Sequence, residues 1–143
     1  MAHIVGFHHL SLSVTDLHRS TKWYQDALGL EMIAEIEGDG FRRNRMRAPD
    51  STVILTLTQH DAERAERFDE RHPGMDHVAV ALRDANEVHD MKGRLEELGV
   101  DHSDVKQSRG GATMITLRDP DNIQLEVFGG PVDVTLAGGS TPS

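Results

Sequence analysis

Alternating apolar and polar positions near the N-terminus predict a β-strand that buries one face. Within residues 5–14, the positions from 9 onward alternate between small or polar and apolar side chains. The apolar set is Leu10, Leu12 and Val14, and the opposite set is His9, Ser11 and Ser13. Because side chains alternate between the faces of a strand, one face is expected to pack on a core and the other to line a polar surface.

The same pattern returns in the second half of the chain and again begins with a histidine. Residues 9–16 read His-Leu-Ser-Leu-Ser-Val-Thr-Asp, and residues 77–84 read His-Val-Ala-Val-Ala-Leu-Arg-Asp. A helical pattern follows each stretch and ends in Leu-Gly, at residues 28–29 and 98–99. The chain therefore resembles one structural unit written twice, and such repeats often build a site between their copies.

Each predicted helix is delimited by residues that favour helix ends. Asp16 and Asp84 can accept hydrogen bonds from free N–H groups of the first turn, while Gly29 and Gly99 suit the left-handed residue after the last turn. Apolar residues at helical spacing predict the buried stripes. They are Leu17, Tyr24, Ala27 and Leu28 in the first helix, and Met91, Leu95 and Leu98 in the second.

Three strand-like segments follow each helix, so each half is predicted to be a βαβββ module in an α+β fold. The segments span 31–36, 41–47 and 52–60 in the first half, and 103–107, 112–118 and 122–128 in the second. Between the halves, the charged stretch 61–71 predicts a short exposed helix.

Chain length predicts a single domain over residues 1–128, with module one at 5–60 and module two at 74–128. Residues 129–143, rich in Gly, Ser, Thr and Pro, predict a flexible tail. Neither a targeting segment nor an apolar run of the ~20 residues that span a bilayer is present, which favours a cytoplasmic protein that does not enter membranes.

Charge and composition narrow the classes of partner. The net charge of −9 argues against nucleic acid, whose phosphates require Lys and Arg. The absence of cysteine leaves imidazole and carboxylate groups as the ligands for any metal. Arg42, Arg43, Arg45 and Arg47 nevertheless lie close together. They form either a solvated strand face or, through Arg43 or Arg45, a contact to an anionic substrate.

Three residues on predicted strands share a face and the chemistry of metal ligands. In the last strand, Ile123, Leu125 and Val127 set the apolar parity, so Gln124 and Glu126 point the other way. His9, His77 and Glu126 then all lie on the face that is not predicted to pack on a helix. Two imidazoles and one carboxylate with open positions suit a catalytic divalent metal, whereas a single strand histidine is usually structural or solvated. His8 has the wrong parity for this site.

The motifs resemble those of the vicinal oxygen chelate superfamily, which includes glyoxalase I, methylmalonyl-CoA epimerase, extradiol dioxygenases, and fosfomycin and bleomycin resistance proteins. The resemblance covers residues 5–128 and is carried by the stretch 9–24, by Leu-Gly-Leu at 28–30, by Gly-Met-Asp-His at 74–77, and by Arg-Asp-Pro-Asp-Asn-Ile-Gln-Leu-Glu at 118–126. It implies paired modules that form an open, cup-shaped mixed sheet with helices on the outer face, and it places His9, His77 and Glu126 at metal-ligand positions.

The chain departs from this resemblance at a fourth ligand position, where glyoxalase I and its relatives commonly carry Glu or Gln. In residues 53–60, Leu55 and Leu57 set the apolar parity, so Thr56, Thr58 and His60 face the predicted cavity. No carboxylate is available there. His60 is then a candidate fourth ligand, catalytic base or substrate contact, or else a solvated strand end.

Three functions remain open, all for a protein that binds a small molecule. The first is a lyase or isomerase that acts through a metal-stabilised enolate, with His60 and Glu126 as the catalytic candidates. The second is an extradiol-type dioxygenase with a two-His, one-carboxylate Fe(II) site. The third is a drug-sequestering resistance protein.

The cofactor and assembly follow from the same considerations. The expected cofactor is one divalent ion, with Fe, Ni, Zn, Co and Mn left open. The candidate substrate contacts are Arg43, Arg45, Thr58 and Gln124. A homodimer is expected because open sheets leave edges that a second copy can cover. Whether the modules pair within a chain or across a dimer is also open.

Overall fold

The computed structural model describes residues 1–62 and 66–131, and it divides them into two compact units. Unit 1 contains the residues up to 68 together with residues 119–121, and unit 2 contains residues 69–118 and those from 122 on. The residues predicted as module one, 5–60, fall in unit 1, and those predicted as module two, 74–128, fall in unit 2 apart from residues 119–121. Most of the tail predicted at 129–143 lies outside the described residues.

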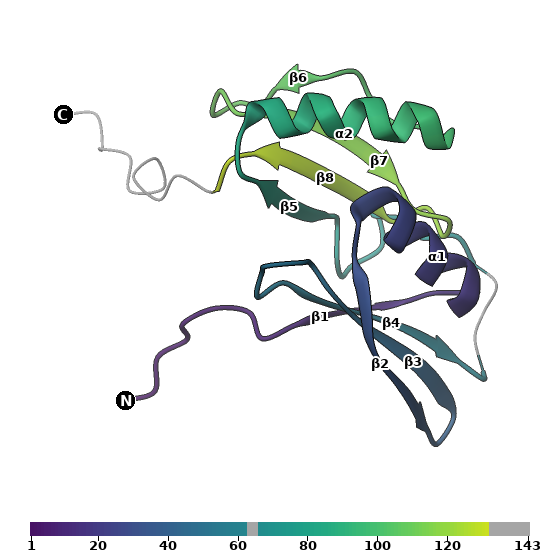
Figure 1. The fold of residues 1–143 in the computed structure, drawn as a ribbon. Helices are drawn as coiled ribbons and strands as arrows, with labels where there is room; N and C mark the ends of the chain where they lie inside the picture. Colours follow the sequence, from purple (N-terminus) through teal and green to yellow (C-terminus); the bar gives the residue numbers. More distant parts are fainter. Residues whose placement is uncertain (63–65, 132–143) are drawn as a thin grey trace. The chain divides into compact units, whose positions relative to one another are not determined.

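Unit 1 is a four-stranded mixed sheet with one helix packed against it (Figure 1). Its strands have the order β1-β4-β3-β2, with β1 parallel to β4 and the remaining pairs antiparallel. The elements are β1 (Leu10–Ser13), α1 (Leu17–Leu28), β2 (Glu31–Gly38), β3 (Phe41–Arg47) and β4 (Ile54–His60).

Unit 2 repeats this arrangement, with strand order β5-β8-β7-β6 and β5 parallel to β8. Figure 1 shows α2 lying across this sheet. The elements are β5 (Val78–Leu82), α2 (Ala85–Leu98), β6 (Lys106–Gln107), β7 (Thr113–Arg118) and β8 (Gln124–Gly129). The predicted α+β class and the two βαβββ modules are thus confirmed.

The helix ends form where the capping residues predict them. The Asp16 carboxylate accepts a hydrogen bond from the backbone N–H of Arg19 at 2.9 Å, and that of Asp84 accepts from the N–H groups of Asn86 and Glu87. Both helices end at a glycine with φ +68°, a left-handed conformation that a side chain disfavours. Neither helix, nor any other in the described residues, is long and apolar enough to cross a membrane.

The core of each unit lies between the helix and the apolar face of the sheet. In unit 1, Leu17, Tyr24 and Ala27 of α1 are buried as predicted, whereas Leu28 is only half-buried. In unit 2, Leu95 is buried, but the predicted stripe is wrong at its ends. Val88 is fully buried, while Leu98 is 44% exposed and Met91 half-buried. The buried stripe of α2 therefore starts one turn earlier than the spacing of its larger apolar residues indicates.

Two further segments differ from the prediction. The helix predicted at 61–71 is not formed by the described residues of that stretch, which are turns and irregular chain. The strand predicted at 103–107 shortens to Lys106–Gln107. His102 and Ser103 still contact β7, through an isolated bridge to Leu117 and a hydrogen bond from the Ser103 N–H to the Thr116 carbonyl. Residues 102–103 therefore contact β7 without forming a continuous strand pairing with it.

A buried polar cluster holds residues 119–121 against α1 within unit 1. The Tyr24 hydroxyl donates to Oδ2 of Asp119 at 2.9 Å. The backbone N–H and the hydroxyl of Thr15 both donate to the Asp121 carboxylate. Asp119 and Asp121 are about as buried as the apolar core, and these partners compensate the cost of removing them from water.

Candidate functional site

The polar face of the unit 1 sheet is built from rows of side chains that run across its strands. One row consists of Ser11, Thr56, Arg45 and Ala34, each paired with the next in the register. The row beside it consists of Ser13, Thr58, Arg43 and Ile36. Leu12, Leu55, Leu57 and Met46 have the opposite parity and are buried. The sheet therefore presents the candidate substrate contacts Arg43, Arg45 and Thr58 on the face opposite the buried apolar residues.

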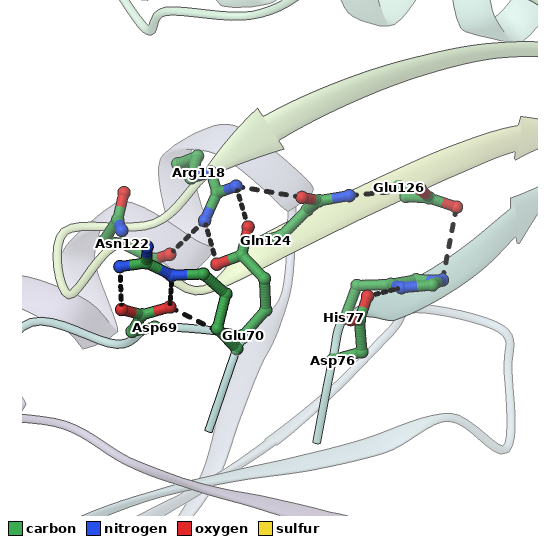
Figure 2. A network of polar contacts seen from close by, with 9 residues as sticks. Asp69, Glu70, Asp76, His77, Arg118, Asn122, Gln124 and Glu126 are labelled. Atoms are coloured by element: carbon green, nitrogen blue, oxygen red, sulfur yellow. Dashed lines mark hydrogen bonds and ion pairs between the residues drawn. The ribbon is translucent and has the colours of Figure 1, made fainter. Parts of the chain in front are cut away.

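The polar face of unit 2 carries two of the three predicted metal ligands. Leu125 and Val127 of β8 are buried, and Glu126, which has the opposite parity, is half-buried beside Ala79 of β5 and Thr116 of β7. His77 immediately precedes β5. Its Nε2 atom lies 3.5 Å from Oε2 of Glu126 (Figure 2).

The ring of His77 is held by a second carboxylate. Nδ1 of His77 lies 2.6 Å from Oδ1 of Asp76, on the opposite side of the ring from Glu126 (Figure 2). The hydrogen bond with Asp76 raises the pKa of His77 above its ordinary value, with the charge of Glu126 acting in the same direction and desolvation opposing both. Because Asp76 engages Nδ1, Nε2 is the ring nitrogen directed at Glu126.

A chain of hydrogen bonds positions the other oxygen of Glu126. The side-chain amide of Gln124 donates to Oε1 of Glu126 at 3.2 Å, and its own carbonyl accepts from Nη2 of Arg118 at 3.0 Å. Arg118 in turn binds both carboxylate oxygens of Glu70, at 2.7 and 3.1 Å. This bond with Arg118 lowers the pKa of Glu70 to about 2. Figure 2 shows the chain running from Glu70 along β8 to His77.

Sequence reasoning missed two members of this chain. Arg118 opens the motif at 118–126, and its parity with Gln124 across the β7 and β8 register was available as a signal. Glu70 lies in an irregular segment, where no periodicity marks it. Gln124, predicted as a substrate contact, is bonded on both sides by protein groups, to Arg118 and to Glu126.

The third predicted ligand, His9, belongs to unit 1. It immediately precedes β1, is exposed, and has its Nδ1 atom 2.8 Å from Nδ1 of His8. Within the described residues, no three His, Asp or Glu side chains are grouped closely enough to hold a metal ion. Within unit 2, the structure thus brings together His77 and Glu126, while His9 belongs to the other unit.

The repeat identifies the residue at the fourth ligand position. Thr56 pairs with Ser11 two residues after His9, just as Glu126 pairs with Ala79 two residues after His77. Thr56 is therefore the unit 1 counterpart of Glu126. It is 1% exposed, and its hydroxyl has no hydrogen-bond partner among the described residues.

His60 has the predicted parity but lies in a different row. It pairs with Phe41 at the end of β4, and their ring centroids are 6.4 Å apart. If the β1 and β4 register continued by one residue, His9 would lie level with Ile54, which is 60 − 54 = 6 residues from His60. At ~3.3 Å per residue, that separation is ~20 Å. The register therefore does not bring His60 to His9, as ligation of one ion would require.

Comparison with known proteins agrees with the repeat and the fold. The sequence profile of the Glyoxalase/Bleomycin resistance protein/Dioxygenase superfamily matches residues 6–127. No curated protein gives a significant sequence match.

Solved structures of similar fold come from several bacteria. A glyoxylase/bleomycin resistance protein/dioxygenase domain from Frankia sp. EAN1pec has a TM-score of 0.83 and 27% identity, over 90% of this chain and 100% of that one. A glyoxalase family protein from Enterococcus faecalis has a TM-score of 0.71 and 20% identity, over 87% and 97%. The fosfomycin resistance protein FosX from Listeria monocytogenes, complexed with Mn(II) and 1S,2S-dihydroxypropylphosphonic acid, has a TM-score of 0.71 and 21% identity, over 96% and 100%. With the family match spanning most of its length, this chain belongs to the glyoxalase/bleomycin resistance protein/dioxygenase superfamily.

Proposed function

We propose that this protein is a divalent-metal-dependent enzyme that acts on a small molecule, with His77, Glu126 and His9 as the metal ligands. The observation that carries the proposal is the arrangement of His77, whose Nε2 faces Glu126 while its Nδ1 is bonded to Asp76. Metal-bound imidazoles characteristically have their second nitrogen bonded to a carboxylate or carbonyl in this way.

The donor atoms of His77 and Glu126 fit a divalent ion of intermediate hardness. One neutral imidazole nitrogen and one carboxylate oxygen suit Zn, Ni, Co, Mn or Fe, and the chain has no thiolate that would compete. The hydrogen bond from Gln124 leaves Oε2 of Glu126 facing His77. Both donors are therefore already oriented by neighbouring side chains.

The assignment of His9 rests on the repeat. It precedes β1 as His77 precedes β5, and β1 and β5 occupy the same place in the two sheets. The FosX structure from Listeria with Mn(II) supports the choice of a divalent ion for this fold.

Such an ion supplies Lewis-acid polarisation of a substrate oxygen, which is the chemistry of lyases and isomerases in this proposal. The protein's own residues would orient the ligands and hold the substrate on the polar sheet faces. Asp76 orients His77, and the hydrogen bonds that lead from Glu70 to Glu126 orient Glu126.

A second candidate is an extradiol-type dioxygenase. It is favoured by Thr56, which leaves a set of two histidines and one carboxylate without a fourth acidic ligand.

We also propose that the protein is a homodimer. Each sheet is open, so β1 and β2 are edge strands of one sheet and β5 and β6 of the other. Met32 and Ile33 on the edge strand β2 are more than 40% exposed, and Ile4, Val5 and Phe7 are almost fully exposed. A second copy would cover edges and apolar side chains of this kind.

Metal analysis of the purified protein tests the proposed function. We expect about one divalent ion per chain by mass spectrometry of the metals, and a strong loss of metal in Glu126→Ala. The matched control is Glu97→Ala, which removes an exposed carboxylate from α2. Iron as the bound metal would favour the dioxygenase, and Ni, Zn, Co or Mn the lyase or isomerase. Full metal content in Glu126→Ala would refute the ligand assignment.

A further inference from the structure

We infer that Arg45 and Arg43 of β3 bind an anionic group of the small-molecule substrate, on the polar face of the unit 1 sheet and with the Thr56 hydroxyl as a further contact. The inference deepens the proposed function and rests on it for the identity of the ligand as a substrate. It assigns the recognition of charge to unit 1, whereas His77 and Glu126 belong to unit 2.

Two buried polar atoms in one row have no hydrogen-bond partner among the described residues. Arg45 and Thr56 are paired in the register of β3 and β4. Nε of Arg45 and Oγ1 of Thr56 are both inaccessible to solvent, and neither makes a hydrogen bond within the described part of the chain. Buried donors and hydroxyls without a partner are rare because each forfeits its hydrogen bonds to water. Two such atoms side by side on a polar face indicate that an acceptor from outside the chain forms the missing hydrogen bonds.

The cross-strand partners of Arg45 carry no charge. They are Ala34 on β2 and Thr56 on β4. By contrast, Arg47 lies opposite Glu31, with 3.9 Å between their charged atoms, and Arg42 lies opposite Glu37 on the other face. Arg42 and Arg47 thus lie opposite glutamates of β2, whereas Arg43 and Arg45 lie opposite Ile36 and Ala34. In a chain of net charge −9, this pattern is unexpected for arginines that serve only as a solvated surface.

Arg43 is held in place by neutral groups. Its Nε donates to Oγ1 of Thr58 at 2.8 Å, and its guanidinium lies 4.5 Å from the centre of the Phe41 ring. Thr58 is also bonded to Ser11 at 3.0 Å. These contacts order the side chain without using its two terminal nitrogens. Arg43 is therefore preorganised to donate to another acceptor.

The spacing of the two arginines suits a single anion. Residues two apart on a strand lie ~7 Å apart on one face, so both guanidinium groups can reach one carboxylate or phosphoryl group placed between them. Guanidinium groups bind such groups by paired N–H donors in one plane. The row of Arg45 includes Ser11, which follows His9 by two residues. A small molecule whose anionic group is bound there could therefore also reach His9.

Nuclear magnetic resonance of arginine side chains tests this inference on the intact protein. The metal is first removed with a chelator, and inorganic phosphate is then titrated while the Nε–Hε signals of the arginines are followed. We expect saturable shifts of the Arg45 and Arg43 signals, with no saturable shift of Arg42. Binding to Arg45→Gln is expected to be about tenfold weaker or more, as for loss of a hydrogen bond to a charged group. Thr56→Val should weaken binding to a smaller extent.

The matched control is Arg42→Gln, which removes the same charge from the opposite face of the same strand and should bind phosphate as the native chain does. The inference is overturned if the Arg45 signal does not respond, or if Arg42→Gln weakens binding as much as Arg45→Gln. The titration of the native protein stands even where a variant fails to fold. Because the metal is absent, loss of the proposed metal site and loss of the anion site give separate results.

Discussion

The hydroxyl of Tyr24 on α1 donates a hydrogen bond of 2.9 Å to the carboxylate of Asp119, which lies 95 residues later in the chain. Both side chains are buried, and Asp119 also accepts a hydrogen bond from the backbone N–H of Asp121. This pair therefore joins the first helix to the turn between β7 and β8. The stability of unit 1 therefore depends on residues 119–121, which are distant in sequence from the rest of the unit.

Replacing Tyr24 by Phe should destabilise the protein by about 1–3 kcal/mol, because it leaves a buried carboxylate oxygen without its donor. Burial first, and then the charge of Asp119, raise the pKa of Tyr24 far above its usual value. The phenol therefore stays protonated in the folded state, and the associated stability is complete below pH ~10 and is lost as the unfolded phenol ionises above it. Urea unfolding between pH 7 and pH 11 measures both effects. If the stability of Tyr24→Phe fell between pH 7 and pH 11 as much as that of the native protein, the pH dependence would not come from Tyr24.

Leu95 and Leu98 of α2 differ sharply in burial, at 0% and 44% exposed. Leu95→Ala should lower the free energy of unfolding by about 2–5 kcal/mol, because a buried side chain leaves a cavity. Leu98→Ala should change it by only about 0.5 kcal/mol. Equilibrium denaturation of the two variants makes the comparison, with each serving as control for the other. Similar losses of unfolding free energy in both variants would indicate that Leu98 is part of the buried stripe, as the sequence predicted.

Asp76→Asn should weaken metal binding by about 10–100-fold, since outer carboxylates orient ligating histidines and increase their basicity. The affinity can be measured by competition with a chromogenic chelator, a readout that does not depend on activity. Asp101→Asn, at an exposed position of the same unit, is the matched control. Unchanged affinity in Asp76→Asn would mean that the contact with His77 has no role in metal binding.

Sedimentation at micromolar concentration is expected to give about twice the chain mass of 15.8 kDa. Met32→Glu, which places a charge on the exposed edge strand β2, should shift the protein towards the monomer if that edge pairs. The charge-conserving control is Glu37→Asp on the same strand. A native mass of one chain would reject the dimer.

Periodicity predicted the elements and the faces of this fold, but it did not predict distances along a strand. The alternation around Leu10 and Val78 and the caps at Asp16 and Asp84 are local signals, and the structure follows them. His60 shows the limit. Its parity was predicted correctly, whereas the row it occupies depends on the register between β1 and β4, which no local pattern encodes.

Tertiary packing determined the other features that the sequence did not reveal. The stripe of α2 was misplaced because Val88 and Leu98 both satisfy helical spacing, and only contact with the sheet decides between them. Glu70 was missed because its role comes from Arg118, 118 − 70 = 48 residues away, and not from its neighbours in sequence.

The matched register of Thr56 and Glu126 has a consequence for how this protein can change over time. Two copies of one architecture carry different chemistry at the same position, a neutral hydroxyl in one and a carboxylate in the other. Under the proposed assignments, substitutions on β3 and β4 would alter which molecule is accepted while His77 before β5 and Glu126 on β8 are kept. The repeated architecture would thus let selectivity change on one sheet while the ligand pair His77 and Glu126 is retained on the other.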